Sequence, residues 1–160
     1  MGYDALGPGL AGATKEMVML KGYNFEVIIG SDAQAGSLVQ SKGSWFLAVG
    51  DSAFLLLSGN RRGLIVNMPD QYMLLIRKMG SVEVRFLDAI KATSPVPNMA
   101  GPGSIIVFTD NGLRFAGAYE GEPLRLFTED GDLVQEEPRI SAHDFALYVQ
   151  LMGGGEVKVI

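Results

Sequence analysis

Two apolar segments flank an Asn-Gly pair in the stretch from Ser104 to Tyr119, which reads SIIVFTDNGLRFAGAY. Asn-Gly readily forms a two-residue type I′ hairpin turn, because both central residues of that turn need a positive φ. A turn at Asn111-Gly112 places Phe108 opposite Phe115. It also gathers four apolar side chains on one face, namely Ile106, Phe108, Leu113 and Phe115. The pattern therefore predicts a β-hairpin with a compact apolar face.

Further apolar segments, separated by turn residues, predict strands along most of the chain. Met17–Ile29 is the first predicted strand region, with a bulge or break at Gly22, and in it Phe25, Val27 and Ile29 alternate with Asn24, Glu26 and Ile28. Phe54–Leu57 and Tyr72–Ile76 are continuously apolar, which is typical of strands covered on both faces. The segment Phe127–Leu133 repeats the turn composition of the central hairpin and extends the sheet. Glu156–Ile160 alternates again and predicts a final short strand.

One segment near the C-terminus has helical spacing instead. Ser141 can cap a helix N-terminus, and Asp144 suits the positive end of a helix dipole. An apolar stripe at helical spacing follows, formed by Phe145, Tyr148, Val149 and Met152. The predicted fold is mainly β. It is a single-domain antiparallel barrel or sandwich of about nine to ten strands, with one C-terminal helix over residues 141–152 and a final short strand.

The beginning of the chain has a different character. Its sequence, MGYDALGPGLAGA, is small and Gly-rich and has no apolar period. Such a composition favours an extended conformation. We therefore expect an N-terminal arm over residues 1–13 and one β-rich domain over residues 14–160, in line with the length of the chain.

Composition excludes several classes of function. The chain has 160 residues, no cysteine and a net charge of −5. Disulfide scaffolds, thiol catalysis and cysteine-ligated metals are thereby excluded, and no basic patch for nucleic acid is expected. No apolar stretch approaches the ~20 residues of a membrane-spanning helix. The start of the chain is not basic and carries Asp4, so we expect no secretory signal. We expect no cofactor, and a location in the cytoplasm or in an assembly built from it.

Residues with catalytic or ligating chemistry are few. His143 is the only histidine, and no G-x-S-x-G motif supplies a nucleophile for it. The acidic hairpin tip Glu129–Asp132 has ligands that suit a hard cation but lacks the spacing of an EF-hand loop, which leaves cation binding open. Gly7–Gly12 matches G-x-G-x-x-G, but no strand precedes it and no helix follows it, so dinucleotide binding is not expected.

The apolar content suggests self-association. Apolar residues make up 48% of the chain and charged residues only 19%, and a small domain often shares such an excess between subunits. We expect a non-enzymatic structural subunit of a particle, tube or ring, a class that includes viral components, and we expect it to form homo-oligomers. The candidate interface residues are Leu6, Leu10, Phe54, Leu56, Met73 and Leu75. The alternatives are a β-barrel binding module for a peptide or small apolar ligand, and a carboxylate-dependent enzyme.

Overall fold

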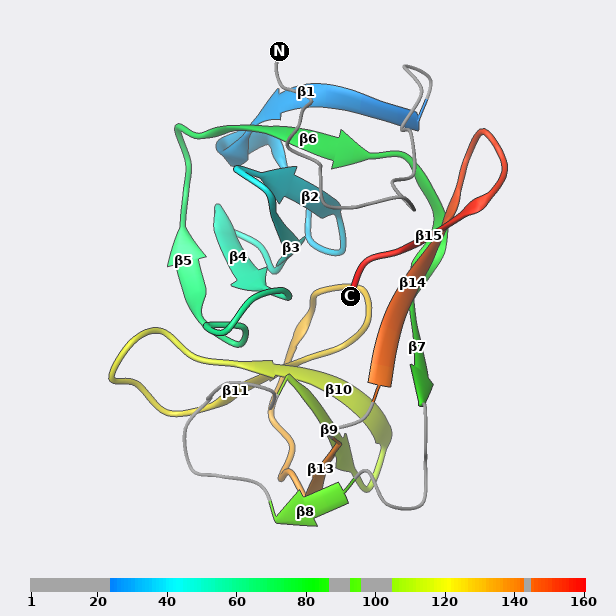
Figure 1. The fold of residues 1–160 in the computed structure, drawn as a ribbon. Helices are drawn as coiled ribbons and strands as arrows, with labels where there is room; N and C mark the ends of the chain where they lie inside the picture. The colour runs from blue at the N-terminus through cyan, green and yellow to red at the C-terminus, as the bar shows by residue number, and fades with distance from the viewer. Residues whose placement is uncertain (1–23, 87–92, 96–104, 143–144) are drawn as a thin grey trace.

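In the computed structural model, residues 24–86, 93–95, 105–142 and 145–160 form a mainly β structure. Fifteen strands lie in these residues and form three antiparallel sheets. Two of the sheets have six strands each and the third has three. Figure 1 shows the sheet that contains β1 (Phe25–Ile29) at the top, the one that contains β10 (Gly112–Gly117) at the bottom and the one that contains β14 (Phe145–Leu151) along the right side. They are called sheet 1, sheet 2 and sheet 3 below. The predicted mainly β antiparallel architecture is confirmed.

Sheet 1 has the strand order β1-β6-β2-β3-β4-β5. A short 3-10 turn, Gly30–Asp32, follows its first strand. The sheet consists of β1 (Phe25–Ile29), β2 (Leu38–Ser41), β3 (Ser44–Ala48), β4 (Ala53–Leu56), β5 (Ile65–Asn67) and β6 (Tyr72–Ile76). Because β6 inserts between β1 and β2, the first strand depends on a partner far along the chain.

Sheets 2 and 3 take up the second half of the chain. Sheet 2 has the order β12-β11-β10-β9-β13-β8 and consists of β8 (Thr93–Pro95), β9 (Ile106–Thr109), β10 (Gly112–Gly117), β11 (Arg125–Phe127), β12 (Leu133–Val134) and β13 (Ile140–Ala142). Sheet 3 has the order β15-β14-β7 and consists of β7 (Lys78–Phe86), β14 (Phe145–Leu151) and β15 (Glu156–Lys158). In the described part of the chain, no helix is long and apolar enough to cross a membrane.

All three sheets contribute side chains to one main apolar core. Leu47 and Leu55 enter it from sheet 1, Phe115 from sheet 2, and Leu147 and Val149 from sheet 3. Each of these side chains is fully or almost fully buried. Burying such a side chain stabilises a fold by roughly 1.5–3 kcal/mol, so this shared core holds the three sheets together.

Sheets 1 and 2 meet backbone to backbone beside Gly117. The N–H of Ile65 donates to the carbonyl of Ala118 at 2.9 Å, and the N–H of Ala118 donates to the carbonyl of Gly63 at 2.9 Å. A Cβ atom at position 117 would overlap the Cδ1 of Leu55 and lie 2.8 Å from the carbonyl oxygen of Gly63. Only glycine allows the two sheets to approach this closely.

The turn of the central hairpin is placed differently from the prediction. Asp110 and Asn111 form the two-residue turn, and neither has a positive φ, whereas Gly112 has a φ of 122°. The prediction of a type I′ turn at Asn111-Gly112 is therefore wrong. The N–H of Asn111 donates to the Oγ1 of Thr109 at 3.1 Å. This side-chain bond stabilises a turn in which one glycine after the corner supplies the positive φ.

The register of this hairpin shifts with its turn. Phe108 pairs with Leu113, and Ile106 pairs with Phe115, instead of Phe108 with Phe115. A shift of two residues keeps every side chain on its original face, because side chains alternate with a period of two. The predicted apolar face is therefore confirmed: all four side chains lie in or against the main core.

The predicted C-terminal helix over residues 141–152 is wrong. This segment contains the end of β13 and all of β14. The sequence of β14 also has a period of two, and tertiary pairing with β7 and β15 selects it. Met152, assigned to the apolar face of the helix, is 60% exposed in the turn to β15. The side chains that enter the core alternate along the strand: Phe145, Leu147, Val149 and Leu151.

Two further expectations about the fold need correction. None of the three sheets closes into a barrel, and the described residues hold more strands than the predicted nine to ten, because several strands have only two or three residues. The final short strand is confirmed as β15. Residues 1–13 lie outside the described residues, so the division into an arm and one domain stays a prediction.

We predict that Gly117→Ala lowers the free energy of unfolding by at least about 2 kcal/mol, because the added methyl group forces sheets 1 and 2 apart. Urea denaturation measures this change. Gly43→Ala is the control: Gly43 has a φ of 81°, and a Cβ atom at this position would have no neighbouring atom within 4 Å, so this variant should lose only about 1 kcal/mol from backbone strain. A Gly117→Ala variant as stable as the wild type would contradict the close sheet contact.

Candidate functional site

β1 is the outermost strand of sheet 1 among the described residues, where it pairs only with β6. Two backbone hydrogen bonds of 2.8 Å flank this pair: the N–H of Gly30 donates to Gln71, and the N–H of Arg77 donates to Asn24. Hydrogen-bonded positions alternate along an antiparallel strand, so the even-numbered residues of β1 bond to β6. The backbone groups that point to the open edge therefore belong to Phe25, Val27 and Ile29.

The side chains beside this edge are apolar and exposed. Val27 is 64% exposed and Tyr72 is 70% exposed. Val27 lies opposite Leu74, and Ile29 lies opposite Tyr72, so all four share one face of the β1–β6 pair. Figure 1 shows β1 along the top rim of the molecule, with β6 directly below it. We call these features together the β1 edge: the outward backbone groups of β1 with the exposed side chains of Val27 and Tyr72.

The β1 edge carries little charge. Glu26 is the only charged residue of β1, and its carboxylate lies 3.5 Å from the guanidinium of Arg77. Both side chains are about half exposed, so this ion pair contributes at most about 1 kcal/mol. It nevertheless supplies a counter-charge to the one carboxylate on the strand, which lowers the cost of placing another strand beside it.

The opposite face of sheet 1 brings together four of the predicted interface residues. Phe54 and Met73 are buried in a second apolar cluster, and Leu56 and Leu75 pack against it half-buried. The ring of Phe54 meets that of Phe46 edge to face, with centroids 6.4 Å apart. Sheet 1 is therefore apolar on both faces, as the continuous apolar segments predicted. Phe54 and Met73 are already buried within the chain itself.

An open groove lies between the end of β6, the start of β7 and the loop before β2, with a volume of about 600 Å³. Leu75 and Ile76 form an apolar wall, and Lys78 and Asp130 also line it. The Nζ of Lys78 donates to the carbonyl of Gly80 at 2.8 Å. Burial lowers the pKa of Lys78, and the nearby Asp130 carboxylate partly offsets this effect. The groove thus combines an apolar wall with one half-buried ammonium group.

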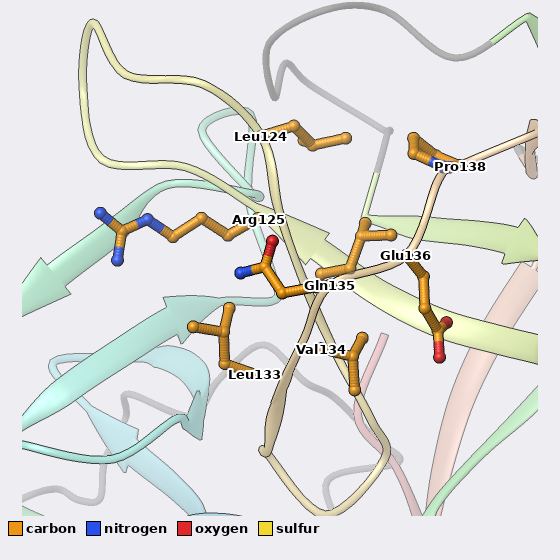
Figure 2. A pocket seen from close by; sticks show the side chains of 8 residues that line it. Leu124, Arg125, Leu133, Val134, Gln135, Glu136 and Pro138 are labelled. Atoms are coloured by element: carbon orange, nitrogen blue, oxygen red, sulfur yellow. The ribbon is translucent and has the colours of Figure 1, made fainter.

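A smaller hollow of about 220 Å³ lies beside β11 and β12. Figure 2 shows Leu124, Val134 and Pro138 around it, with the guanidinium of Arg125 extending away from them. Leu124 and Val134 also pack against a third, small apolar cluster. The hollow is thus mostly a gap in apolar packing, and its acidic lining residue, Glu136, is turned toward Arg114.

Glu136 fastens the central hairpin to the segment that leads into β13. Its Oε1 accepts from the Nε of Arg114 and from the Oγ1 of Thr109, both at 2.8 Å. Its Oε2 accepts from the Nη2 of Arg114 at 3.1 Å and from the Nδ2 of Asn111 at 3.2 Å. These hydrogen bonds, that of Arg114 above all, hold the pKa of Glu136 below its usual value. The carboxylate is therefore held ionised, in a structural role.

Sheet 3 carries a second ionic cluster. Arg85 bonds to both Glu83 and Glu156, and its guanidinium lies 4.0 Å from the ring centroid of Tyr148. Hydrogen bonds from Arg85 lower the pKa of both carboxyl groups. A general acid needs a raised pKa to keep its proton near neutral pH, so these two groups are suited to ion pairing rather than to proton donation.

The remaining sequence candidates fall into two groups. His143, Leu6, Leu10 and the Gly7–Gly12 motif lie outside the described residues. At the acidic tip, Asp130 accepts a hydrogen bond from the Oγ of Ser81 at 3.0 Å. Within the described ranges, no three acidic or histidine side chains come close enough together to hold a metal ion.

Sequence reasoning missed Val27 and Tyr72 as a pair. Each was recognised as part of a strand, but their proximity depends on the pairing of β1 with β6, which are separated by four other strands. A weak signal was present, because β1 carries apolar residues at odd and even positions alike. Such a strand has no wholly polar face to turn toward water.

We predict that acid weakens the fold partly through Glu136. Its pKa is lower in the folded chain than in the unfolded chain, so its stabilisation is complete above the unfolded value and is lost as pH falls through the folded value. Glu136→Gln should therefore melt at a lower temperature than the wild type near about pH 6, and the difference should narrow toward about pH 3. Thermal unfolding followed by circular dichroism measures both curves.

The control for this experiment is Glu129→Gln, at an exposed position on the β11–β12 turn. It should follow the wild-type curve at every pH. If the melting temperatures of Glu136→Gln and the wild type differed by the same amount down to low pH, the stabilising role of the ionised Glu136 carboxylate would be wrong.

Comparisons with known proteins add no relative. No protein-family model matches the chain, no curated protein matches it, and no solved structure matches it.

Proposed function

We propose that the protein is a non-enzymatic structural subunit that associates with other copies of itself through sheet 1. The observation that carries this proposal is the β1 edge. There, outward backbone groups lie next to the exposed side chains of Val27 and Tyr72. An edge strand with free N–H and C=O groups is a ready template for another strand.

The composition and the regular pairing of β1 support its use in association. Soluble β proteins usually protect such edges with lysine, proline, a bulge or a covering loop. β1 contains neither lysine nor proline, and it pairs with β6 in unbroken register over all five of its residues. Its single charge, Glu26, has Arg77 beside it. A regular apolar edge of this kind favours strand addition.

Ligand binding is the second candidate, and the groove beside Lys78 favours it. Its volume of about 600 Å³ lies within the range of roughly 300–1,000 Å³ that is usual for small-molecule sites. Such a site would lie between sheets 1 and 3, on the surface, and not inside a barrel. The groove combines its apolar wall with two cationic side chains, Arg77 and Lys78, and one carboxylate, Asp130, so an amphipathic anion fits it.

We predict that the protein is larger than its 17.1 kDa monomer in solution and that Val27→Lys weakens its association. Lysine places an ammonium group at the β1 edge, which should raise the dissociation constant by about tenfold or more. Light scattering over roughly a hundredfold dilution measures the mass. Leu133→Lys is the control, because Leu133 is also exposed and also lies on an outermost strand, but in sheet 2.

The two lysine variants separate the possible outcomes. Equal weakening by both would point to association through general apolar contact and not through sheet 1. A monomer at every concentration would refute the proposed function and favour the groove, which titration with an amphipathic anion such as a fatty acid would then test.

We also predict that deleting residues 1–13 weakens association while leaving the domain folded. The arm carries Leu6 and Leu10, which are expected to be buried against a neighbouring copy. Light scattering reports the mass, and circular dichroism reports the fold. If the truncated chain associates as tightly as the full chain, the arm has no part in assembly, and the β1 edge alone has to account for it.

A further inference from the structure

We propose that the partner at the β1 edge is a second copy of this chain, paired β1 to β1 in antiparallel orientation about a two-fold axis at Val27. This inference rests on the proposed function and names the geometry of one contact. Strand pairing of this kind joins two six-stranded sheets into one continuous sheet.

The backbone of β1 limits the possible registers. Only its odd-numbered residues point outward, so two β1 strands can bond only where odd residues face odd residues. With Val27 opposite the partner's Val27, Phe25 faces the partner's Ile29 and Ile29 faces the partner's Phe25. All three outward residues are then used, which gives about six backbone hydrogen bonds.

The neighbouring registers are poorer. Moving the pairing by two residues in one direction places Glu26 directly opposite the partner's Glu26, and like charges directly opposite each other are destabilising. Moving it in the other direction places Phe25 opposite the partner's Ser31, which lies in the 3-10 turn after β1. Only the register centred on Val27 pairs every outward group and avoids the charge clash.

Side chains also match across the proposed contact. On the face of Val27, one row across the joined sheets reads Leu74, Val27, the partner's Val27 and the partner's Leu74. The next row reads Tyr72, Ile29, the partner's Phe25 and the partner's Ile76. Every member is apolar or aromatic, and such cross-strand pairs stabilise a sheet. Val27 gains the partner's Val27 as a direct cross-strand neighbour, whereas Tyr72 lies one strand further from the contact, behind Ile29.

The second face of the contact is compatible as well. Glu26 lies opposite the partner's Ile28, and it keeps Arg77, just after β6, as its neighbour at 3.5 Å. No two like charges oppose each other across this register. The contact is therefore self-complementary on both faces, as a two-fold symmetric interface has to be.

Disulfide cross-linking tests the register directly, because the chain has no cysteine of its own. In the proposed dimer the Cα atoms of position 27 and of its symmetry mate are about 5.5 Å apart, within the range for a disulfide. Those of position 26 and its mate are about 8 Å apart, outside that range. Under mild oxidation, Val27→Cys should cross-link about tenfold faster than Glu26→Cys.

A mixture provides the matched control. Glu26→Cys and Ile28→Cys should each cross-link slowly alone, because neither position faces itself. Mixed in equal amounts they should form a heterodimer, because position 26 faces position 28 of the partner. Equal rates for all three single variants, or no faster reaction in the mixture, would overturn the register.

Amide hydrogen exchange on the wild-type chain gives a second test that needs no substitution. The N–H groups of Phe25, Val27 and Ile29 should be protected in the associated state and should lose that protection on dilution. If the wild type stays oligomeric while these three amides exchange freely and Val27→Cys does not cross-link, the β1 pairing is wrong and assembly uses another surface, while self-association itself stands. A wild type that is monomeric throughout refutes both.

Discussion

The backbone contact at Gly117 sets the arrangement of the whole molecule. Sheet 1 and sheet 2 exchange hydrogen bonds between Gly63–Ile65 and Ala118, at a distance that excludes a side chain at position 117. With the sheets held there, Leu55 and Phe115 enter one common core. Sheet 3 then closes the side of that core with the alternating residues of β14. A small domain gains most of its stability from such a shared core, so the three sheets are expected to unfold together.

This arrangement leaves the two edges of sheet 1 in different situations. β5 lies beside sheet 2, where the N–H of Ile65 bonds to Ala118. β1 lies at the far end of the sheet, and its outward groups meet no described strand. β1 carries a single charge, Glu26, and an edge strand with so little charge is costly for a protein that has to stay monomeric. Its regular pairing with β6 is more easily understood if the edge is used in association.

Sequence reasoning recovered what depends on local chemistry. The glycines at turns and the spacing of apolar residues predicted most strands of sheet 1. They also predicted the central hairpin, with the correct face turned toward the core. The predicted hairpin register is wrong by two residues, because the turn is stabilised by a hydrogen bond from the N–H of Asn111 to the Oγ1 of Thr109. The helix over 141–152 failed because Phe145 and Val149 fit both a helical and a strand pattern, and only long-range pairing with β7 decides between them. Val27 and Tyr72 were missed for the same reason, since only the long-range pairing of β1 with β6 places them on one face.

The same geometry favours strand addition over the stacking of sheet faces. The candidate residues on the second face of sheet 1 are largely committed to the chain itself: Phe54 and Met73 are almost fully buried. Stacking two copies on that face could therefore bury only the partly exposed apolar surface around Leu56 and Leu75. At the β1 edge, by contrast, backbone groups and two large exposed side chains are available at once. Association there gains hydrogen bonds and apolar burial together, without any change in the core that Gly117 makes possible.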